Sequence, residues 1–297
     1  MKEADVMHRN WAKLTDSLIE AALAEDLGAG DITTDATVPP ELTSTAFLFS
    51  KSDGVLAGID VGMKVFHKVD NQLETKTLYK DGEHISKGQK IAEISGSVSS
   101  ILKGERTALN FLGRLTGIAT TTSEYVGKIN GLRSKILDTR KTMPTMRHLD
   151  KYAVRVGGGH NHRFGLFDMV LIKDNHIAVA GGIRIAVDNV IKEIKKKDEN
   201  IKIEVECQSY EEVLEAVYTP VDIIMLDNMD LADIERSVKL ISETNAENGR
   251  IIRIEASGNI SLDTVCDVAE TGVDYISIGA LTHTVVNHDF TLLFEEL

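Results

Sequence analysis

The spacing of hydrophobic residues divides the chain into a mixed first part and a regularly alternating second part. Residues 15–17 can cap a helix whose apolar positions form one stripe and which Gly28 ends. From Thr43 to about Ile101, short β-prone pieces follow one another, separated by turn glycines. Residues 105–118 return to helical spacing. The first part is therefore expected to hold a sheet with helices before and after it.

Six apolar, β-branched runs recur in the second part, and amphipathic stretches separate most of them. They are KIL before Asp138, MVLI before Lys173, IKIEV before Glu206, DIIML before Asp227, RIIRI before Glu255 and DYISI before Gly279. Alternating strands and helices imply a parallel sheet with right-handed crossovers. A barrel needs more than six strands, and we expect a seventh near residues 154–156. We predict an α/β barrel that departs from eight-fold regularity, with an open doubly wound sheet as the alternative.

Polar groups stand where each of these runs ends. The ends are Asp138 to Lys141, Lys173 with Asp174, Glu206, Asp227 with Asn228, Ser257 with Gly258, and Gly279. The carboxyl ends of parallel strands meet at one mouth, which is where α/β barrels place their active sites. The sequence therefore predicts one site built from six strand ends.

The distribution of charge indicates whether the ligand of this site is an anion or a cation. The chain carries a net charge of −13, which argues against general binding of nucleic acids or anionic membranes. Residues 133–184 invert that balance, with ten Lys or Arg against four Asp or Glu, a net of +6. A solvated basic face would be the ordinary explanation of such a run. Because these charges sit at strand ends and beside glycines, they favour a pocket for a small anion.

The candidate site residues fall into three chemical groups. Guanidinium forks bind carboxylates in pairs, so a cationic group suits a substrate with more than one carboxylate. Two carboxylates suit Mg²⁺, ribose hydroxyls or an oxocarbenium-like centre, unless they only neutralise neighbouring lysines. Two glycine turns after the last strands suit a phosphate. The groups are Arg140, Lys141, His162, Arg163 and Lys173; Glu206 and Asp227; and Ser257-Gly258-Asn259 with Ile278-Gly279-Ala280.

Other chemistries fit less well. His160 and His162 are spaced like a metal pair, but Arg163 would repel a cation and no third His or Cys has suitable spacing. Lys173 at a strand end is compatible with a Schiff-base aldolase, which we rank second. A phosphosugar-binding barrel without turnover is the alternative that is not an enzyme. The N-terminus has no apolar core of signal-peptide length, and Cys207 and Cys266 form no C-x-x-C pair, so we expect a cytoplasmic protein.

These motifs together resemble those of the quinolinate phosphoribosyltransferases. The matching strings begin at Glu25 and reach His283, and the longest has 27 residues: EDLGAGDITTD, ERTALNFLGRLTGIAT, LDTRKT, KYAVRVGGGHNHRFGLFDMVLIKDNHI, EVEC, IMLDN, EASGNI and GVDYISIGALTH. The resemblance implies transfer of phosphoribose from phosphoribosyl pyrophosphate to quinolinate, with loss of CO2 and with Mg²⁺. A related phosphoribosyltransferase that acts on another base is the nearest alternative. It also implies an N-terminal α/β sandwich (1–114), an about seven-stranded α/β barrel (115–280) and a C-terminal segment (281–297) that packs back on the first domain.

The resemblance also assigns roles to residues. Arg140, His162, Arg163 and Lys173 would hold the carboxylates of quinolinate, joined by Arg106 from a second subunit of a homodimer or larger homo-oligomer. Lys141, Glu206 and Asp227 would line the phosphoribosyl pyrophosphate and Mg²⁺ side, and Thr139 is a further candidate substrate-binding residue. The two glycine turns would hold the 5′-phosphate, with His283 beside them.

One loop departs from the family pattern. The family usually has Thr-Pro-Gly-Leu-Arg after the Arg-Lys pair, whereas this chain has Met143-Pro144-Thr145-Met146-Arg147. Thr145 therefore stands where the resemblance implies a glycine, which puts the conformation of this loop in question.

Overall fold

The computed structural model describes residues 2–197 and 201–295, with side chains for 11–194 and 201–295. The chain forms two compact units. The sheet unit comprises Met1–Ser123, Thr142–Gly158 and Leu281–Leu297, and the barrel unit comprises Glu124–Lys141 and Gly159–Ala280. This division differs from the expected boundary at 114/115, because a single helix, α4 (Val98–Lys128), runs through that boundary and residues 142–158 return to the sheet unit.

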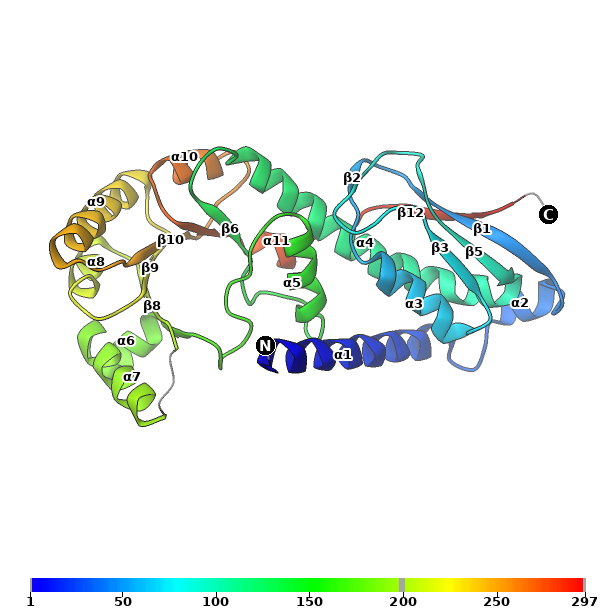
Figure 1. Ribbon diagram of the computed structural model, residues 1–297, viewed down its shortest axis with the longest axis horizontal. Helices are drawn as coiled ribbons and strands as arrows, with labels where there is room; N and C mark the ends of the chain where they lie inside the picture. Colours follow the sequence, from blue (N-terminus) through cyan, green and yellow to red (C-terminus); the bar gives the residue numbers. More distant parts are fainter. Residues whose placement is uncertain (1, 198–200, 296–297) are drawn as a thin grey trace. The chain divides into compact units, whose positions relative to one another are not determined.

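The sheet unit is built on a four-stranded antiparallel sheet with the order β12-β1-β5-β3 (Figure 1). Its strands are β1 (Thr43–Ser50), β3 (Glu74–Thr77), β5 (Lys90–Ser97) and β12 (Phe290–Phe294). A two-stranded ribbon joins β2 (Gly54–Val55) to β4 (His84–Ile85). The C-terminal strand β12 pairs with β1 in register from Ala46 opposite Phe294 to Ser50 opposite Phe290, so the last part of the chain completes the sheet of the first.

Two helices of the sheet unit differ from the sequence prediction. α1 (Lys2–Leu27) begins well before residues 15–17, because helix-forming residues continue the pattern toward the N-terminus. α2 (Ile32–Thr37) follows it. In the β-prone piece at residues 54–59, only Gly54–Val55 forms a strand (β2), and α3 (Ile59–Val69) begins at its last residue.

The packing of α3 explains why a helix forms there. Ile59, Met63 and Phe66 are buried at intervals of four and three, which is the spacing of a helix face. Gly62 allows α4 to approach closely, since a Cβ at this position would lie 2.7 Å from Leu112 Cδ1. Figure 1 shows α3 and α4 together along the sheet.

The expected seventh strand near residues 154–156 is wrong. These residues end α5 (Arg147–Val156), where Leu149, Ala153 and Val154 are buried at helical spacing. Three residues of alternating Val-Arg-Val did not distinguish a strand from the last turn of an amphipathic helix. In place of a seventh strand, His160 makes an isolated parallel bridge with Leu137.

The barrel unit contains all six predicted strands. They form one parallel sheet in the order β6-β11-β10-β9-β8-β7, in a barrel-like arrangement. The strands are β6 (Lys135–Leu137), β7 (Val170–Ile172), β8 (Ile203–Cys207), β9 (Ile223–Asp227), β10 (Arg253–Ser257) and β11 (Tyr275–Ser277). The adjacent parallel strands place their carboxyl ends on the same edge, which confirms the geometry on which the predicted site rests.

Helices connect these strands and cover the sheet. They are α6 (Asp174–Ala180), α7 (Ile183–Lys197), α8 (Tyr210–Ala216), α9 (Leu231–Asn248) and α10 (Val265–Glu270). α11 (Ala280–His283) follows the last strand, β11, and residues 281–283 belong to the sheet unit. All five residues of β8 are buried, as expected for a strand covered on both faces. Among the residues described, no helix has both the length and the apolar character needed to cross a membrane.

Thr145 occupies a backbone conformation that favours glycine. Its φ is 68°, in the left-handed region where a β-branched side chain is disfavoured. Thr145→Gly is therefore expected to be more stable than Thr145→Ala by about 1 kcal/mol, as judged by denaturant unfolding. Thr145→Ala is the matched control because it removes the hydroxyl, which contacts Pro144 O, but keeps the Cβ. Equal stability of the two variants would contradict strain at this position.

Candidate functional site

Asp138 anchors the segment that carries the cationic residues. It follows β6, its side chain is buried, and it accepts hydrogen bonds from Asn161 Nδ2 at 2.5 Å and from the His162 backbone N–H at 2.9 Å. The Asp138 N–H in turn donates to His160 O at 3.1 Å. The chain from His160 to Arg163 is thus fixed beside the end of β6, where sequence analysis placed a substrate site.

The His162 ring faces the interior of the barrel. Its side chain is 6 % exposed, and its Nε2 lies 3.0 Å from Glu204 Oε2 and 3.5 Å from Glu255 Oε1. The Arg163 backbone N–H donates to His162 Nδ1 at 2.8 Å. With both nitrogens engaged in this way, the ring as placed offers neither of them to a substrate.

Glu204 and Glu255, the interior carboxylates, were not predicted as site residues. Glu204 lies in β8 and Glu255 in β10, and their side chains are 0 % and 1 % exposed. Burial raises the pKa of each carboxyl to about 8. Ser277 Oγ donates to Glu255 at 2.5 Å. The signal available in the sequence was a single acidic residue inside an otherwise apolar run, as in IKIEV.

His162, Glu204 and Glu255 have the spacing of a metal site, with ligand atoms within 4.8 Å of one another. The hydrogen bond at Nδ1 argues against that use. Nδ1 accepts an N–H, so the ring proton of the neutral imidazole is on Nε2, the atom that a metal would need. Moving the proton to Nδ1 would set two donors against each other.

Arg163 and Arg140 form the cationic part of the mouth. Arg163 donates from one guanidinium nitrogen to Met169 O at 3.1 Å, while its Nε is buried and makes no hydrogen bond within the described part of the chain. Burial lowers the pKa of Arg163, and the charge of Arg140 lowers it further. Two guanidinium groups this close suit a ligand with more than one negative charge.

The acidic residues lie on the neighbouring strands. Glu206 is 7 % exposed and makes a close ion pair with Lys173, which precedes α6. Asp227 ends β9 and accepts from Asn228 Nδ2 at 2.8 Å. Because Lys173 is engaged by Glu206, the contact argues against the aldolase alternative, which requires a lysine amine that is free to attack a carbonyl.

The turns after β9 and β10 pack directly on each other. Gly258 has a φ of 100°, and a Cβ there would lie 2.2 Å from Asn228 Oδ1 and 2.9 Å from Asn228 N. Asn259 Nδ2 donates to Asn228 Oδ1 at 3.1 Å, and Asn228 N–H donates to Ser257 O at 2.9 Å. Glycine at position 258 therefore lets the two turns pack against each other at the mouth.

Gly258→Ala is expected to weaken phosphoribosyl pyrophosphate binding about tenfold, because the added methyl displaces Asn228 and strains a left-handed backbone. The KM for phosphoribosyl pyrophosphate measures the effect. Gly249→Ala is the control, since Gly249 also has a positive φ (62°) but a Cβ there would meet nothing within 4 Å. The same loss in both variants would show that strain, and not the contact with Asn228, is responsible.

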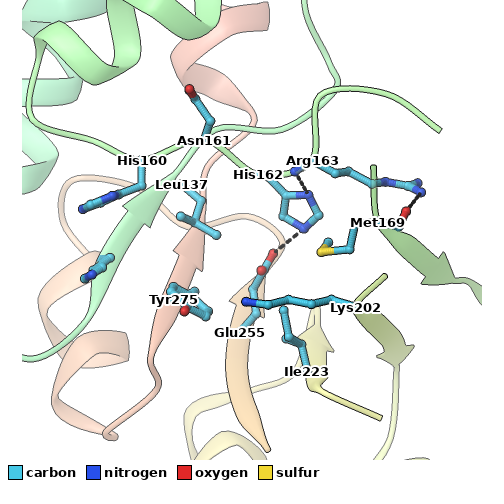
Figure 2. Close-up of a pocket in the computed structure, with 11 residues that line it drawn as sticks. Leu137, His160, Asn161, His162, Arg163, Met169, Lys202, Ile223, Glu255 and Tyr275 are labelled. Atoms are coloured by element: carbon cyan, nitrogen blue, oxygen red, sulfur yellow. Dashed lines mark hydrogen bonds and ion pairs between the residues drawn. The ribbon is translucent and has the colours of Figure 1, made fainter. Parts of the chain in front are cut away.

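A cavity of about 250 Å³ lies on the other side of the His162 ring. Lys135, Ile223 and Tyr275, the first residues of β6, β9 and β11, line it, so it opens toward the amino-terminal ends of the strands. Figure 2 shows the His162 ring directed at Glu255 and the Arg163 guanidinium directed away from that carboxylate toward Met169. His162 and Arg163 both line this cavity.

The remaining predicted residues have varied environments. Lys141 is exposed, and its N–H donates to Thr139 Oγ1 at 3.1 Å. The Ile278 side chain is 2 % exposed, so only its backbone could face a ligand. Arg106 on α4 and His283 in α11 belong to the sheet unit, whereas all the other predicted site residues belong to the barrel unit. His283 Nδ1 lies 2.7 Å from Thr284 Oγ1.

Comparison with known proteins identifies one family of similar proteins. The sequence profile of the quinolinate phosphoribosyl transferase N-terminal domain matches residues 31–116, and that of the C-terminal domain matches residues 118–293. The nicotinate-nucleotide pyrophosphorylase (carboxylating) of Arabidopsis thaliana is 42 % identical over 292 residues, covering 93 % of this chain and 81 % of the relative. Quinolinate phosphoribosyltransferase (decarboxylating) 1 of Nicotiana glauca is 42 % identical over 285 residues, with the same two coverages.

Solved structures give the same result. The nicotinate-nucleotide pyrophosphorylase from Francisella tularensis superimposes with a TM-score of 0.87 at 40 % identity, covering 95 % of this chain and 96 % of that one. Both profiles match in the expected order, and both halves of the fold correspond. The chain therefore belongs to the quinolinate phosphoribosyl transferase family.

Proposed function

We propose that this protein transfers phosphoribose from phosphoribosyl pyrophosphate to quinolinate and releases pyrophosphate and CO2, so that nicotinate mononucleotide is formed for NAD biosynthesis. The observation that carries the proposal is the pair of adjacent guanidinium groups, Arg140 and Arg163, on the same strand-end edge as Glu206 and Asp227. A dianionic pyridine suits the first pair, and a sugar that becomes cationic suits the second.

The residues divide the work by charge. Arg140, Arg163 and Lys173 bind the two carboxylates and offset their repulsion from the pyrophosphate. The pyridine nitrogen forms a bond to the ribose carbon as the bond to pyrophosphate breaks, and Glu206 and Asp227 stabilise positive charge on the sugar. The pyridinium then accepts the electron pair of the adjacent C–CO2 bond, so CO2 leaves without a separate decarboxylation cofactor.

The phosphate groups lie on the glycine-turn side. The backbone N–H groups around Ser257, Gly258 and Gly279, with Asn259 and Ala280, bind the 5′-phosphate. Thr139 and Lys141 lie toward the pyrophosphate, where an exposed lysine supplies a mobile point charge.

Mg²⁺ fits the acidic pair by its chemistry. Glu206 and Asp227 supply carboxylate oxygens on adjacent strands, and Mg²⁺ typically uses one or two carboxylates together with substrate phosphates. These two residues would hold the ion, which would neutralise charge on the leaving pyrophosphate.

The test is formation of nicotinate mononucleotide from quinolinate, phosphoribosyl pyrophosphate and Mg²⁺, with nicotinate replacing quinolinate as the control. Carboxyl-labelled quinolinate should release CO2 only when phosphoribosyl pyrophosphate is present. Turnover of nicotinate but not quinolinate would mean that the protein is a phosphoribosyltransferase that acts on a different base. Rapid release of label without phosphoribosyl pyrophosphate would rule out the proposed order, in which the pyridinium forms first and CO2 leaves afterwards.

The active site is completed by a second subunit, with Arg106 supplied in trans within a homodimer or larger homo-oligomer. Mixing the inactive variants Arg106→Ala and Lys173→Ala after dissociation should restore activity, because one site of each mixed dimer carries both changes and the other carries none. Random pairing predicts roughly a quarter of wild-type activity. If mass measurements show mixed dimers and no activity returns, Arg106 does not act in trans.

The cytoplasm is the proposed location. Cys207 and Cys266 are both free thiols, and Cys207 is buried inside the barrel unit, as expected of a protein kept under reducing conditions.

A further inference from the structure

The interior carboxylates have no role in the proposed transfer, yet they form the most unusual polar cluster in the barrel. Glu204 and Glu255 are buried and interact with each other, and His162 Nε2 lies 3.0 Å from Glu204 Oε2. Burying two neighbouring carboxyl groups is costly, so a cluster of this kind calls for a function.

Strand geometry places these carboxylates directly below the mouth. Side chains two residues apart on a strand point to the same face, so Glu204 lies one layer below Glu206 and Glu255 one layer below Ser257. The His162 ring enters the barrel between this layer and the mouth, with Nε2 at 3.0 Å from Glu204 and 3.5 Å from Glu255.

A chain of contacts leads from this layer to the substrate cations. The His162 ring is held at Nε2 by the interior carboxylates, and its Nδ1 accepts the Arg163 backbone N–H at 2.8 Å. Asp138 holds the same segment from the other side through the His162 N–H. Rotation of the ring would release the backbone from which the Arg163 side chain extends.

We infer that Glu204 and Glu255 are positioning residues that hold the His162 ring from inside the barrel and thereby set the backbone that presents Arg163 to a substrate carboxylate. This inference rests on the proposed function. It gives His162 a role through its neighbours and not through direct contact with the substrate.

Quinolinate affinity provides the readout. Glu204→Ala should raise the quinolinate Kd, measured by calorimetry, roughly tenfold, which is at the upper end for one neutral hydrogen bond. Affinity for phosphoribosyl pyrophosphate should not change. Glu204→Gln keeps an oxygen that can accept the Nε2 proton, so it should recover most of the affinity. If Glu204→Ala fails to fold, Glu204→Gln and Glu255→Gln are compared with wild type in the same titration.

A double-mutant cycle separates positioning from general weakening. Arg163→Lys keeps the positive charge but loses the paired N–H donors of the guanidinium. In this background, Glu204→Ala should reduce quinolinate affinity by a smaller factor than it does in the wild-type protein. Asp274→Asn is the matched control, because Asp274 is a buried carboxylate of the same barrel that pairs with Arg133 and Arg253 at the opposite strand ends. It should lower the midpoint of thermal unfolding without changing the quinolinate Kd.

The outcomes are distinct. Additive effects in the cycle, an unchanged Kd in folded Glu204→Ala, or an equal loss in Asp274→Asn would overturn the inference. A wild-type protein that neither binds nor converts quinolinate would instead overturn the proposed function.

Discussion

Arg163→Ala is expected to raise the quinolinate Kd about 100-fold, because it leaves one carboxylate of a desolvated dianion without its partner. The Arg163 Nε is buried and makes no hydrogen bond among the described residues, so its N–H can donate to a ligand. The structure also lowers the pKa of Arg163 through burial and the charge of Arg140, and a bound dianion would relieve that repulsion. Calorimetric titration with quinolinate measures the change.

Arg236→Ala is the matched control for this substitution. Arg236 lies on α9, its side chain is 60 % exposed, and its ion pair with Asp233 joins neighbouring turns of one helix. Its removal should leave the quinolinate Kd unchanged. If Arg163→Ala binds quinolinate like wild type, Arg163 does not recognise the carboxylates.

Asp227→Ala is expected to lower kcat by roughly 100- to 1000-fold, since it removes a charge that acts most strongly when the sugar is cationic. Quinolinate affinity should be retained, because Asp227 lies on the acidic side of the mouth and contacts Asn228. Steady-state kinetics at saturating substrates, together with direct binding, separate the two quantities.

Asp227→Asn refines the result, because it keeps the shape of the side chain and removes its charge. It should be nearly as slow as Asp227→Ala if charge is what matters. A loss of quinolinate affinity in Asp227→Ala, combined with retention of affinity in Arg163→Ala, would mean that the two roles are assigned the wrong way round.

The barrel strands were predictable because each one combines a short apolar run with a polar end. DIIML and RIIRI are too short and too β-branched for buried helices, and the residues after them need solvent or a ligand. The alternation with helices then leaves few topologies. Most of the barrel therefore follows from local patterns that tertiary packing reinforces.

The interior layer was not predictable in the same way. The polar end of this strand was correctly placed at Ser257 and Gly258, but Glu255, which follows the run RIIRI, was not assigned to the interior, where it is buried. In sequence, a carboxylate inside a strand resembles a carboxylate at its end. The distinction depends on where the neighbouring strands stop, and therefore on pairing between distant segments.

His162 illustrates a related limit. Its position beside Arg163 suggested a substrate contact, while the direction of its ring depends on carboxylates 42 and 93 residues farther along the chain. α3 was missed for a local reason. Residues 54–59 are apolar enough for a strand, and only the burial of Met63 and Phe66 against α4 makes the next segment helical.

The pairing of β12 with β1 has a consequence for synthesis of the chain. β1 ends at Ser50 and its partner begins at Phe290, so 240 residues must be made before that edge can be paired. At 5–20 residues per second, this takes roughly 12 to 48 s. During this time β1 presents an open edge with buried-type residues such as Leu48, and edges of this kind recruit other strands. We therefore expect the nascent chain to be most prone to aggregation through β1 until the segment that forms β12 has been made.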